Sequence, residues 1–323
     1  MKVFVTGGAG YIGSVCVEIL LNAGHHVTVF DNLSEGHRSA VDERARFVQG
    51  DLSDSATLTT ALQGSGAQVV LHFAASALVA ESMSNPSKYF RNNVANGLNL
   101  IQAAVSSEVR KFVFSSTCAT YGPPDRIPIT EDLPQHPINP YGESKLMFEK
   151  MLQWYHEIHG LEFVAFRYFN ASGATQMCGE HHRIETHLIP NVLRVALGQL
   201  PFAELYGTDY PTPDGTCIRD YIHVHDLAQA HILAMEPGSL GFYNLGNGEG
   251  YSVREVIDVC RRISGKEILV MERPRRPGDP PRLVASSTKA RQGLGWEPKF
   301  PKLEDIVASA WEWHNRHPRG YLD

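Results

Sequence analysis

The chain has 323 residues, 43% of them hydrophobic, so it can bury one large core or two smaller ones. Its formal net charge of −6 excludes the basic footprint of a nucleic-acid-binding protein. No apolar run reaches the ~18–20 residues of a membrane-spanning helix. The five cysteines lack regular spacing and no signal-peptide pattern opens the sequence, so we expect a cytoplasmic protein with free thiols.

Strand-like and helix-like segments alternate over the first half of the chain. An apolar run at 3–6 is followed by helical apolar spacing at 10–23. Repeated alternation of this kind predicts an α/β protein with a Rossmann-like, doubly wound parallel sheet. Further strands are predicted at 27–30, 46–49, 69–73, 112–115 and 163–168, and further helices at 88–105 and 141–159.

The pattern changes after about residue 170, where loops rich in Gly, Pro and Asp separate shorter periodic pieces. This change predicts a smaller C-terminal α/β lobe that closes over the carboxyl edge of the sheet, where ligands bind in such folds. We therefore expect a first domain over 1–169 and a second lobe over 170–323. Segments after 215 could return to the first domain.

A glycine-rich stretch, TGGAGYIG, joins the first predicted strand to the first predicted helix. Gly7, Gly10 and Gly13 let the backbone approach a pyrophosphate, for which the helix N-terminus supplies N–H donors. Asp31 follows near the ~20-residue offset of a carboxylate that bonds a ribose 2′-OH, and Asp51 is placed to reach an adenine. Each aspartate alone also fits ordinary turn chemistry. Together these residues predict a dinucleotide site that prefers NAD to NADP.

Tyr141 and Lys145 are four residues apart in NPYGESK, so their side chains share one face of the predicted helix. A close ammonium and a positively charged nicotinamide ring would lower the pKa of the phenol and make it a base near neutral pH. A surface Tyr–Lys pair is the alternative. Thr117 ends the fifth predicted strand, where its hydroxyl could donate to a reacting oxygen or cap a turn.

The motifs, taken in chain order, resemble the extended short-chain dehydrogenases/reductases, and within them the UDP-glucose 4-epimerase family. They are TGGAGYIG, DNLS, GDL, HFAA, FSST, NPYGESK, RYFN, RDYIHV, RRPGD and RHPRGY. The resemblance implies an NAD-dependent isomerase that interconverts UDP-glucose and UDP-galactose. Sugar C4 is oxidised transiently, the 4-keto sugar turns over, and hydride returns to its other face. The resemblance also implies a homodimer formed through 88–105 and 141–159.

The resemblance assigns the first domain to NAD and most of the second lobe to the UDP-sugar. It makes Tyr141 the base, with Lys145 on the nicotinamide ribose and Thr117 where many members carry Ser. Ala77 departs from the family, because many relatives have a Lys there. The implied NAD contacts are Gly7, Gly10, Tyr11, Ile12, Gly13, Asp31, Asn32, Asp51, Leu52, Phe73, Ala74, Ala75, Asn92, Ser115, Tyr141, Lys145 and Tyr168.

The second lobe carries the sugar-nucleotide contacts that the resemblance implies. Its arginines suit a diphosphate, which needs charge-assisted bonds, although Arg219 could instead pair with Asp220. The resemblance also implies a size gate for the sugar near Leu283; leucine is intermediate in size, so acceptance of UDP-GlcNAc and UDP-GalNAc stays open. The implied contacts are Thr117, Tyr141, Asn170, His187, Leu188, Tyr206, Arg219, Arg276 and Asp279.

Rival interpretations share parts of this pattern. Nucleotide-sugar 4,6-dehydratases carry acidic residues directly after the hydroxyl residue, whereas Cys118 and Ala119 stand there in this chain. Uronic-acid 4-epimerases fit the C-terminal motifs less well, and a non-catalytic NAD-binding sensor would usually lack the Tyr or the Lys. We expect no metal, and interpret the cluster of Cys178, His181, His182 and His187 as a polar substrate loop.

Overall fold

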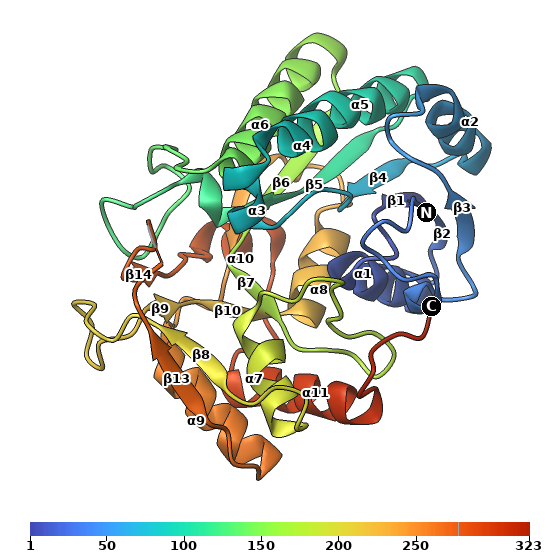
Figure 1. The fold of residues 1–323 in the computed structure, drawn as a ribbon. Helices are drawn as coiled ribbons and strands as arrows, with labels where there is room; N and C mark the ends of the chain where they lie inside the picture. Colours follow the sequence, from blue (N-terminus) through green and yellow to red (C-terminus); the bar gives the residue numbers. More distant parts are fainter. Residues whose placement is uncertain (277) are drawn as a thin grey trace.

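A seven-stranded parallel sheet forms the centre of the computed structural model, which describes residues 1–276 and 278–323 (Figure 1). The strand order β11-β6-β5-β4-β1-β2-β3 reverses direction between β1 and β4, which is the switch point where doubly wound sheets bind ligands. The predicted fold class is therefore confirmed. The strands are β1 (Lys2–Thr6), β2 (His26–Asp31), β3 (Arg46–Gln49), β4 (Val69–His72), β5 (Lys111–Thr117), β6 (Glu162–Tyr168) and β11 (Gly241–Leu245).

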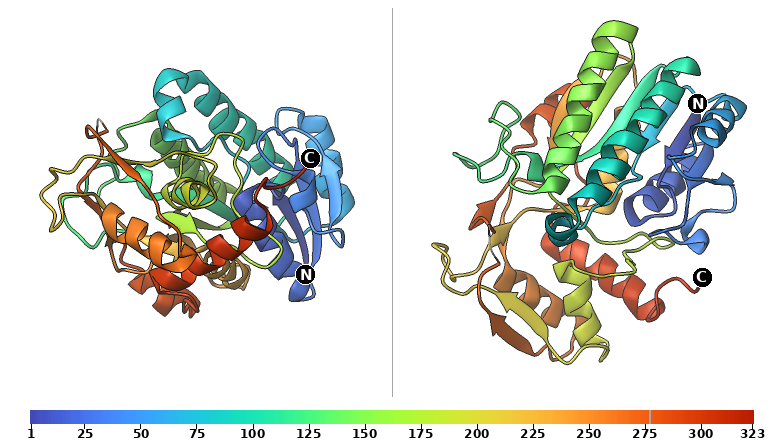
Figure 2. Two further views of the ribbon diagram at one scale, coloured as in Figure 1. Left: turned by 60° about the horizontal axis from the view of Figure 1, so that its bottom comes forward. Right: turned by 45° about the horizontal axis from the view of Figure 1, so that its top comes forward.

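Helices cover both faces of the sheet because successive strand residues point to opposite sides. Val3 and Val5 of β1 pack in one apolar cluster, and Phe4 between them packs in the other. The first face carries α1 (Tyr11–Asn22), α8 (Val224–Leu233) and α10 (Thr288–Leu294). The second carries α2 (Ser55–Ser65), α5 (Gly97–Ser106) and α6 (Pro140–His159), and Figure 2 shows α5 and α6 side by side.

A separate apolar core supports the smaller lobe. It lies among α7 (Leu188–Ala196), α9 (Val253–Ser264) and α11 (Leu303–Arg316), beside the pair β8 (Ala203–Tyr206) and β13 (Val270–Arg273). β7 (Asn170–Ser172) pairs with β10 (Tyr221–His223), and β9 (Ile218–Arg219) lies between β12 (Tyr251–Ser252) and β14 (Arg282–Leu283). β11 and α8 follow residue 215 yet pack in the layers of the large sheet. The boundary at 169/170 stays a prediction.

The helical stretch predicted over 88–105 is confirmed, but its middle is not an α-helix. After α3 (Val79–Ser84), α4 (Pro86–Tyr89), the π-helix η2 (Phe90–Asn96) and α5 follow one another without a break. Apolar spacing does not reveal a π-helical turn, because such a turn accepts the same residue types as an α-helix and differs only in being wider. The wider turn buries Asn93, whose amide bonds Ser76 and Ser144.

A buried ion pair fixes α6 to the neighbouring strand β6. Arg167 donates to Glu149 through Nε (3.1 Å) and Nη2 (2.7 Å), and both residues are almost fully buried. Ser116 Oγ also donates to Glu149, at 2.5 Å. Since Glu149 lies one helical turn after Lys145, the pair sets the position of the helix that carries the predicted base.

None of the helices in the described part of the chain is both long and apolar enough to cross a membrane.

Candidate active site

The glycine loop lies between β1 and α1, as the sequence predicts, and it leaves no room for a side chain at Gly7 or Gly13. A Cβ on Gly7, which has φ +74°, would lie 2.4 Å from the backbone nitrogen of Ala74. A Cβ on Gly13 would lie 2.1 Å from the carbonyl oxygen of Gly7. Gly10 is the N-cap of α1 and has no side chain to occupy the first N–H groups of the helix. The loop therefore presents free backbone donors at a helix N-terminus, which is the geometry that binds a pyrophosphate.

Replacing Gly13 with Ala is expected to abolish measurable NAD binding and to lower the free energy of unfolding by about 1–3 kcal/mol, since the added methyl collides with backbone. Gly64→Ala on α2 is the matched control, because its Cβ would meet no atom within 4 Å and Gly64 is not a predicted NAD contact. Calorimetric NAD titration and urea denaturation of both variants measure the effects. Normal NAD binding by Gly13→Ala would contradict this account of the loop.

Asp31 connects the end of β2 to the glycine loop. Its Oδ2 accepts from the backbone N–H of Ala9 (3.0 Å) and its Oδ1 from that of Leu33 (2.8 Å). Burial raises the pKa of Asp31, and the two backbone hydrogen bonds oppose that rise. Asn32 donates to Asp51 at 2.6 Å, so two further predicted NAD residues meet across β2 and β3. Predicted nucleotide contacts thus gather at the carboxyl ends of neighbouring strands.

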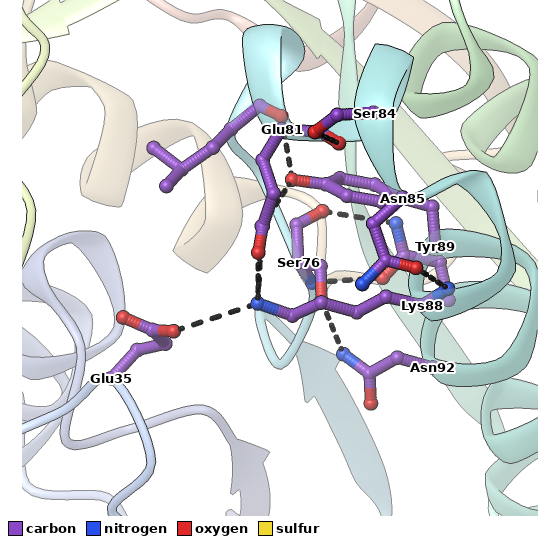
Figure 3. Close-up of polar contacts among 10 residues, drawn as sticks. Glu35, Ser76, Glu81, Ser84, Asn85, Lys88, Tyr89 and Asn92 are labelled. Atoms are coloured by element: carbon purple, nitrogen blue, oxygen red, sulfur yellow. Dashed lines mark hydrogen bonds and ion pairs between the residues drawn. The ribbon is translucent and has the colours of Figure 1, made fainter.

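The segment after β4 forms the opposite side of the switch point. The backbone N–H groups of Phe73 and Ala74 both donate to the carbonyl of Thr6, at 2.9 and 3.1 Å, which holds the segment against the glycine loop. Asn92 on η2 donates to Ser76 Oγ at 3.1 Å (Figure 3). Ala75 is the remaining predicted NAD residue of this segment, whereas Leu52 is buried after β3 on the other side of the switch point.

The sequence did not predict the contacts of Lys88, which lies near the segment where Ala77 replaces the family's lysine. Its Nζ donates to both oxygens of Glu81 (2.9 and 3.0 Å) and lies 3.9 Å from Glu35 Oε1 (Figure 3). Tyr89 donates to the same Glu81 at 2.8 Å. The lysine therefore links α3 and α4 to the loop after β2. No local pattern signals such a contact between distant segments.

The predicted catalytic residues lie together where β5 ends and α6 begins. Asn139 caps α6 by accepting from the Gly142 N–H (2.8 Å), which places Tyr141 in the first turn of the helix. Lys145 is buried, donates to the Ser115 carbonyl at 2.7 Å, and has its Nζ 6.0 Å from the centre of the Tyr141 ring. Tyr and Lys are thus brought together as the spacing predicts.

Thr117 caps the turn after β5, which is one of the two roles that the sequence left open; its role as a donor stays a prediction. Its Oγ1 accepts from the Ala119 N–H at 3.1 Å, which caps the turn, and its own hydroxyl proton remains available to donate. Burial raises the pKa of Tyr141 to about 12, and a hydrogen bond with the Thr117 side chain opposes that rise. The hydroxyl is therefore placed beside the phenol.

Without NAD the pKa of Tyr141 is raised, and the lowering expected from Lys145 together with a charged nicotinamide ring stays a prediction. Burial lowers the pKa of Lys145 to about 7, against the opposing charge of Glu149, and burial of the phenol dominates its own titration. Spacing along a helix gives proximity but not the depth of burial, which decides the direction here. A positively charged ring stacked beside the phenol would act in the lowering direction.

The arginines of the smaller lobe lie near other predicted substrate residues. Arg219 Nη2 donates to Asp279 Oδ1 at 2.5 Å, and the Arg276 guanidinium lies 4.0 Å from the centre of the Tyr206 ring. The alternative pairing of Arg219 with Asp220 is not formed. The Asp220 carboxylate instead accepts from the backbone N–H groups of Asn247, Gly248 and Ala285, at 2.8, 3.0 and 3.0 Å.

Other predicted contacts are already engaged within the protein. Asn170 donates to the Asp220 carbonyl at 2.8 Å, and Tyr168 lies 2.5 Å from His231 Nε2 through its hydroxyl. Tyr11 donates to the Gly173 carbonyl at 2.6 Å, and Ile12 beside it is partly buried. His187 is the N-cap of α7, whose first residue is Leu188. The Tyr11 contact holds the segment after β7 against the start of α1, next to the glycine loop.

Similarity to known proteins agrees with this geometry. The model of the NAD dependent epimerase/dehydratase family matches residues 3–246, and the chain belongs to that family. The UDP-glucose 4-epimerase of Halalkalibacterium halodurans is 52% identical over 99% of this chain and 98% of its own.

Two solved structures extend the similarity to the fold. The UDP-glucose 4-epimerase from Brucella ovis in complex with NAD has a TM-score of 0.93 and 47% identity, covering 96% of this chain and 97% of its own. That from Bifidobacterium longum, in complex with NAD⁺ and UDP, has a TM-score of 0.95 and 37% identity, covering 99% and 100%.

Proposed function

We propose that the protein catalyses the NAD-dependent interconversion of UDP-glucose and UDP-galactose. The observation that carries the proposal is the position of Tyr141, beside Thr117 and Lys145 and at the same carboxyl edge of the sheet as the glycine loop. A base, a hydroxyl donor and a dinucleotide cradle at one switch point can oxidise and re-form a secondary alcohol.

The residues present fit NAD. The backbone cradle at Gly7 and Gly13 is one that any Cβ would fill, and Asp31 supplies a carboxylate at the end of β2. Bound NAD supplies a hydride acceptor that gives the hydride back. The Asp31 carboxylate disfavours a second negative group at the ribose, so NAD is preferred to NADP.

Proton transfer falls to Tyr141. Its phenolate takes the proton of the sugar 4-hydroxyl as the carbonyl forms, and returns it when the alcohol is restored. The Thr117 hydroxyl donates to the same sugar oxygen, and the ammonium of Lys145 stabilises the negative charge on the phenolate. Because burial keeps these groups away from bulk water, their mutual interactions are strengthened.

Arg219 and Arg276 bind the substrate diphosphate. In the structure each guanidinium already has a partner, Asp279 or the Tyr206 ring, which holds it in place before binding. Planar guanidinium groups recognise phosphate oxygens through paired hydrogen bonds. With the UDP part held in this way, the 4-keto sugar can turn over and present its other face.

The dehydratase alternative lacks its acid. Cys118 occupies the position after Thr117, and burial raises the pKa of its thiol to about 12, so it keeps its proton.

The preference between plain and N-acetylated UDP-sugars rests on Leu283, which pairs with Arg219 across β14 and β9.

The assembly we propose is a cytoplasmic homodimer formed through α5 and α6. Met147, Trp154 and Ile158 of α6 are 39%, 62% and 68% exposed, which leaves an apolar stripe on the outer side of the helix. Exposed apolar stripes of this kind support association with a second copy.

The test is proton NMR of the purified protein with UDP-galactose, in separate tubes with added NAD and with added NADP, while absorbance reports NADH. We expect UDP-glucose to form without net NADH and NADP to support the reaction less well. No conversion in either tube, in protein that binds NAD, would overturn the proposed function. Equal conversion by apoprotein reconstituted with either cofactor would remove only the role of Asp31.

A further inference from the structure

A group of two carboxylates and two imidazoles lies in the loop that precedes α7. The donor atoms of Glu180, His182, Glu185 and His187 all lie within 4.8 Å of one another. Glu180 is only 4% exposed, whereas His187 is half-exposed at the mouth of the group. These residues are close in sequence, but it is the fold of the loop that turns all four side chains toward one point.

Two buried atoms of this group lack hydrogen-bond partners. Glu180 Oε1 is 2.7 Å from His187 Nδ1 and 3.4 Å from His182 Nε2. Within the described ranges, however, neither Glu180 Oε1 nor His182 Nε2 makes any contact with hydrogen-bond geometry. Buried polar atoms are nearly always satisfied, so converging lone pairs without a hydrogen bond indicate a partner that lies between them.

The charge of the group favours a cation. With neutral imidazoles the two carboxylates carry two negative charges in a largely buried place, which is unfavourable without compensation. Glu185 Oε1 lies 3.3 Å from the same His187 Nδ1 that Glu180 approaches, so both carboxylates face one point. A divalent ion at this point would neutralise both carboxylates.

We propose that Glu180, His182, Glu185 and His187 bind one divalent transition-metal ion of the zinc class. Imidazole nitrogen and carboxylate oxygen are both ordinary zinc ligands, and four protein ligands make the closed set typical of a structural site. This set differs from the one considered in the sequence. Cys178 Sγ contacts the Ala40 carbonyl, and His181 stacks on His37 with ring centres 4.6 Å apart.

The ion joins the two sides of the active-site crevice. The His182 ring lies 6.2 Å from the ring of Tyr11, which opens α1, and Arg183 donates to the carbonyls of Leu33 and Gly36 at 3.2 Å each. His187 in turn begins α7 of the smaller lobe. Coordination through Nδ1 leaves its Nε2 for the predicted contact with the sugar nucleotide. The site therefore fixes the loop between the dinucleotide loop and the substrate lobe.

Zinc content and zinc affinity test the proposal in the full chain. The protein is purified without chelator for metal analysis, stripped with EDTA, and titrated with zinc sulfate by calorimetry. We expect about one zinc per chain and a rise in the thermal unfolding midpoint when zinc is added back. Absence of zinc in the purified protein, together with no binding in the titration, would overturn the proposal.

Variants show whether these residues are the ligands. His182→Ala should weaken zinc binding by at least about a hundredfold. Loss of a residue that only supports a metal ligand already costs up to about a hundredfold, and His182 is proposed as a ligand itself. His159→Ala, which removes an exposed imidazole from α6, should leave zinc binding unchanged. Glu185→Gln keeps the side-chain size and serves if His182→Ala does not fold. Equal zinc binding by the folded ligand variant and the parent would exclude this group as the site.

Discussion

Replacing Tyr141 with Phe is expected to lower the turnover of UDP-galactose by about 10²–10⁴-fold while NAD stays bound. The substitution removes only the hydroxyl that carries the proton, and the half-buried ring keeps its packing against Tyr89, whose ring centre is 6.4 Å away. The loss should appear in kcat rather than in KM, because the proton moves only in the transition state. Steady-state kinetics and NAD content per chain measure both parts.

Tyr155→Phe on the same helix is the control for this substitution. Tyr155 is partly buried against the second face of the sheet and takes no part in the proposed chemistry. Removal of the Tyr155 hydroxyl should change turnover by less than about twofold, because this group is remote from the reaction. A Tyr141→Phe protein with nearly normal turnover would remove Tyr141 from its proposed role, whatever the control did.

Replacing Glu149 with Ala is expected to lower the free energy of unfolding by about 3–5 kcal/mol, because it leaves a buried guanidinium without its partner. Arg167 is 2% exposed and makes two hydrogen bonds to that carboxylate. The variant also removes the charge that raises the pKa of Lys145, so this pKa should fall further. Urea denaturation measures the stability.

An exposed ion pair provides the control for this effect. Asp258 and Arg261 form a 2.7 Å pair on α9 with 65% and 42% of their side chains exposed. Asp258→Ala should therefore cost at most about 1 kcal/mol, since solvent screens such pairs. If Glu149→Ala were no more destabilising than Asp258→Ala, the buried pair would not fix α6 to β6 in the way described.

Local patterns predicted most of the large sheet. β3 matches its predicted residues, and the other predicted strands differ by a few residues at their ends, because buried apolar runs are read directly from the sequence. The sequence did not predict the π-helical turn of η2 within the helix over 88–105, because this turn, which includes the buried Asn93, has no signature in apolar spacing. The sequence pattern therefore predicts that a segment is a helix or a strand better than it predicts the type of helical turn within it.

The site was predictable where its parts are close in sequence. Tyr141 and Lys145 share a helix face and meet as expected, but the depth of their burial, and with it the direction of both pKa shifts, depends on the whole fold. The contact between Arg219 and Asp279 joins residues far apart in the chain. The family resemblance suggested that each contacts the substrate, but their spacing in the sequence could not predict that they contact each other. Lys88 was missed for the same reason.

The fate of the hydrogen on sugar C4 tests the central claim most directly. UDP-galactose carrying deuterium at C4 is incubated with the NAD-loaded protein, and the UDP-glucose formed is analysed by NMR. If hydride leaves C4 and returns within one active site, the product keeps its deuterium at C4 and no NADH accumulates. Replacement of the deuterium by hydrogen from solvent would mean that C4 loses a proton instead, and would contradict transient oxidation.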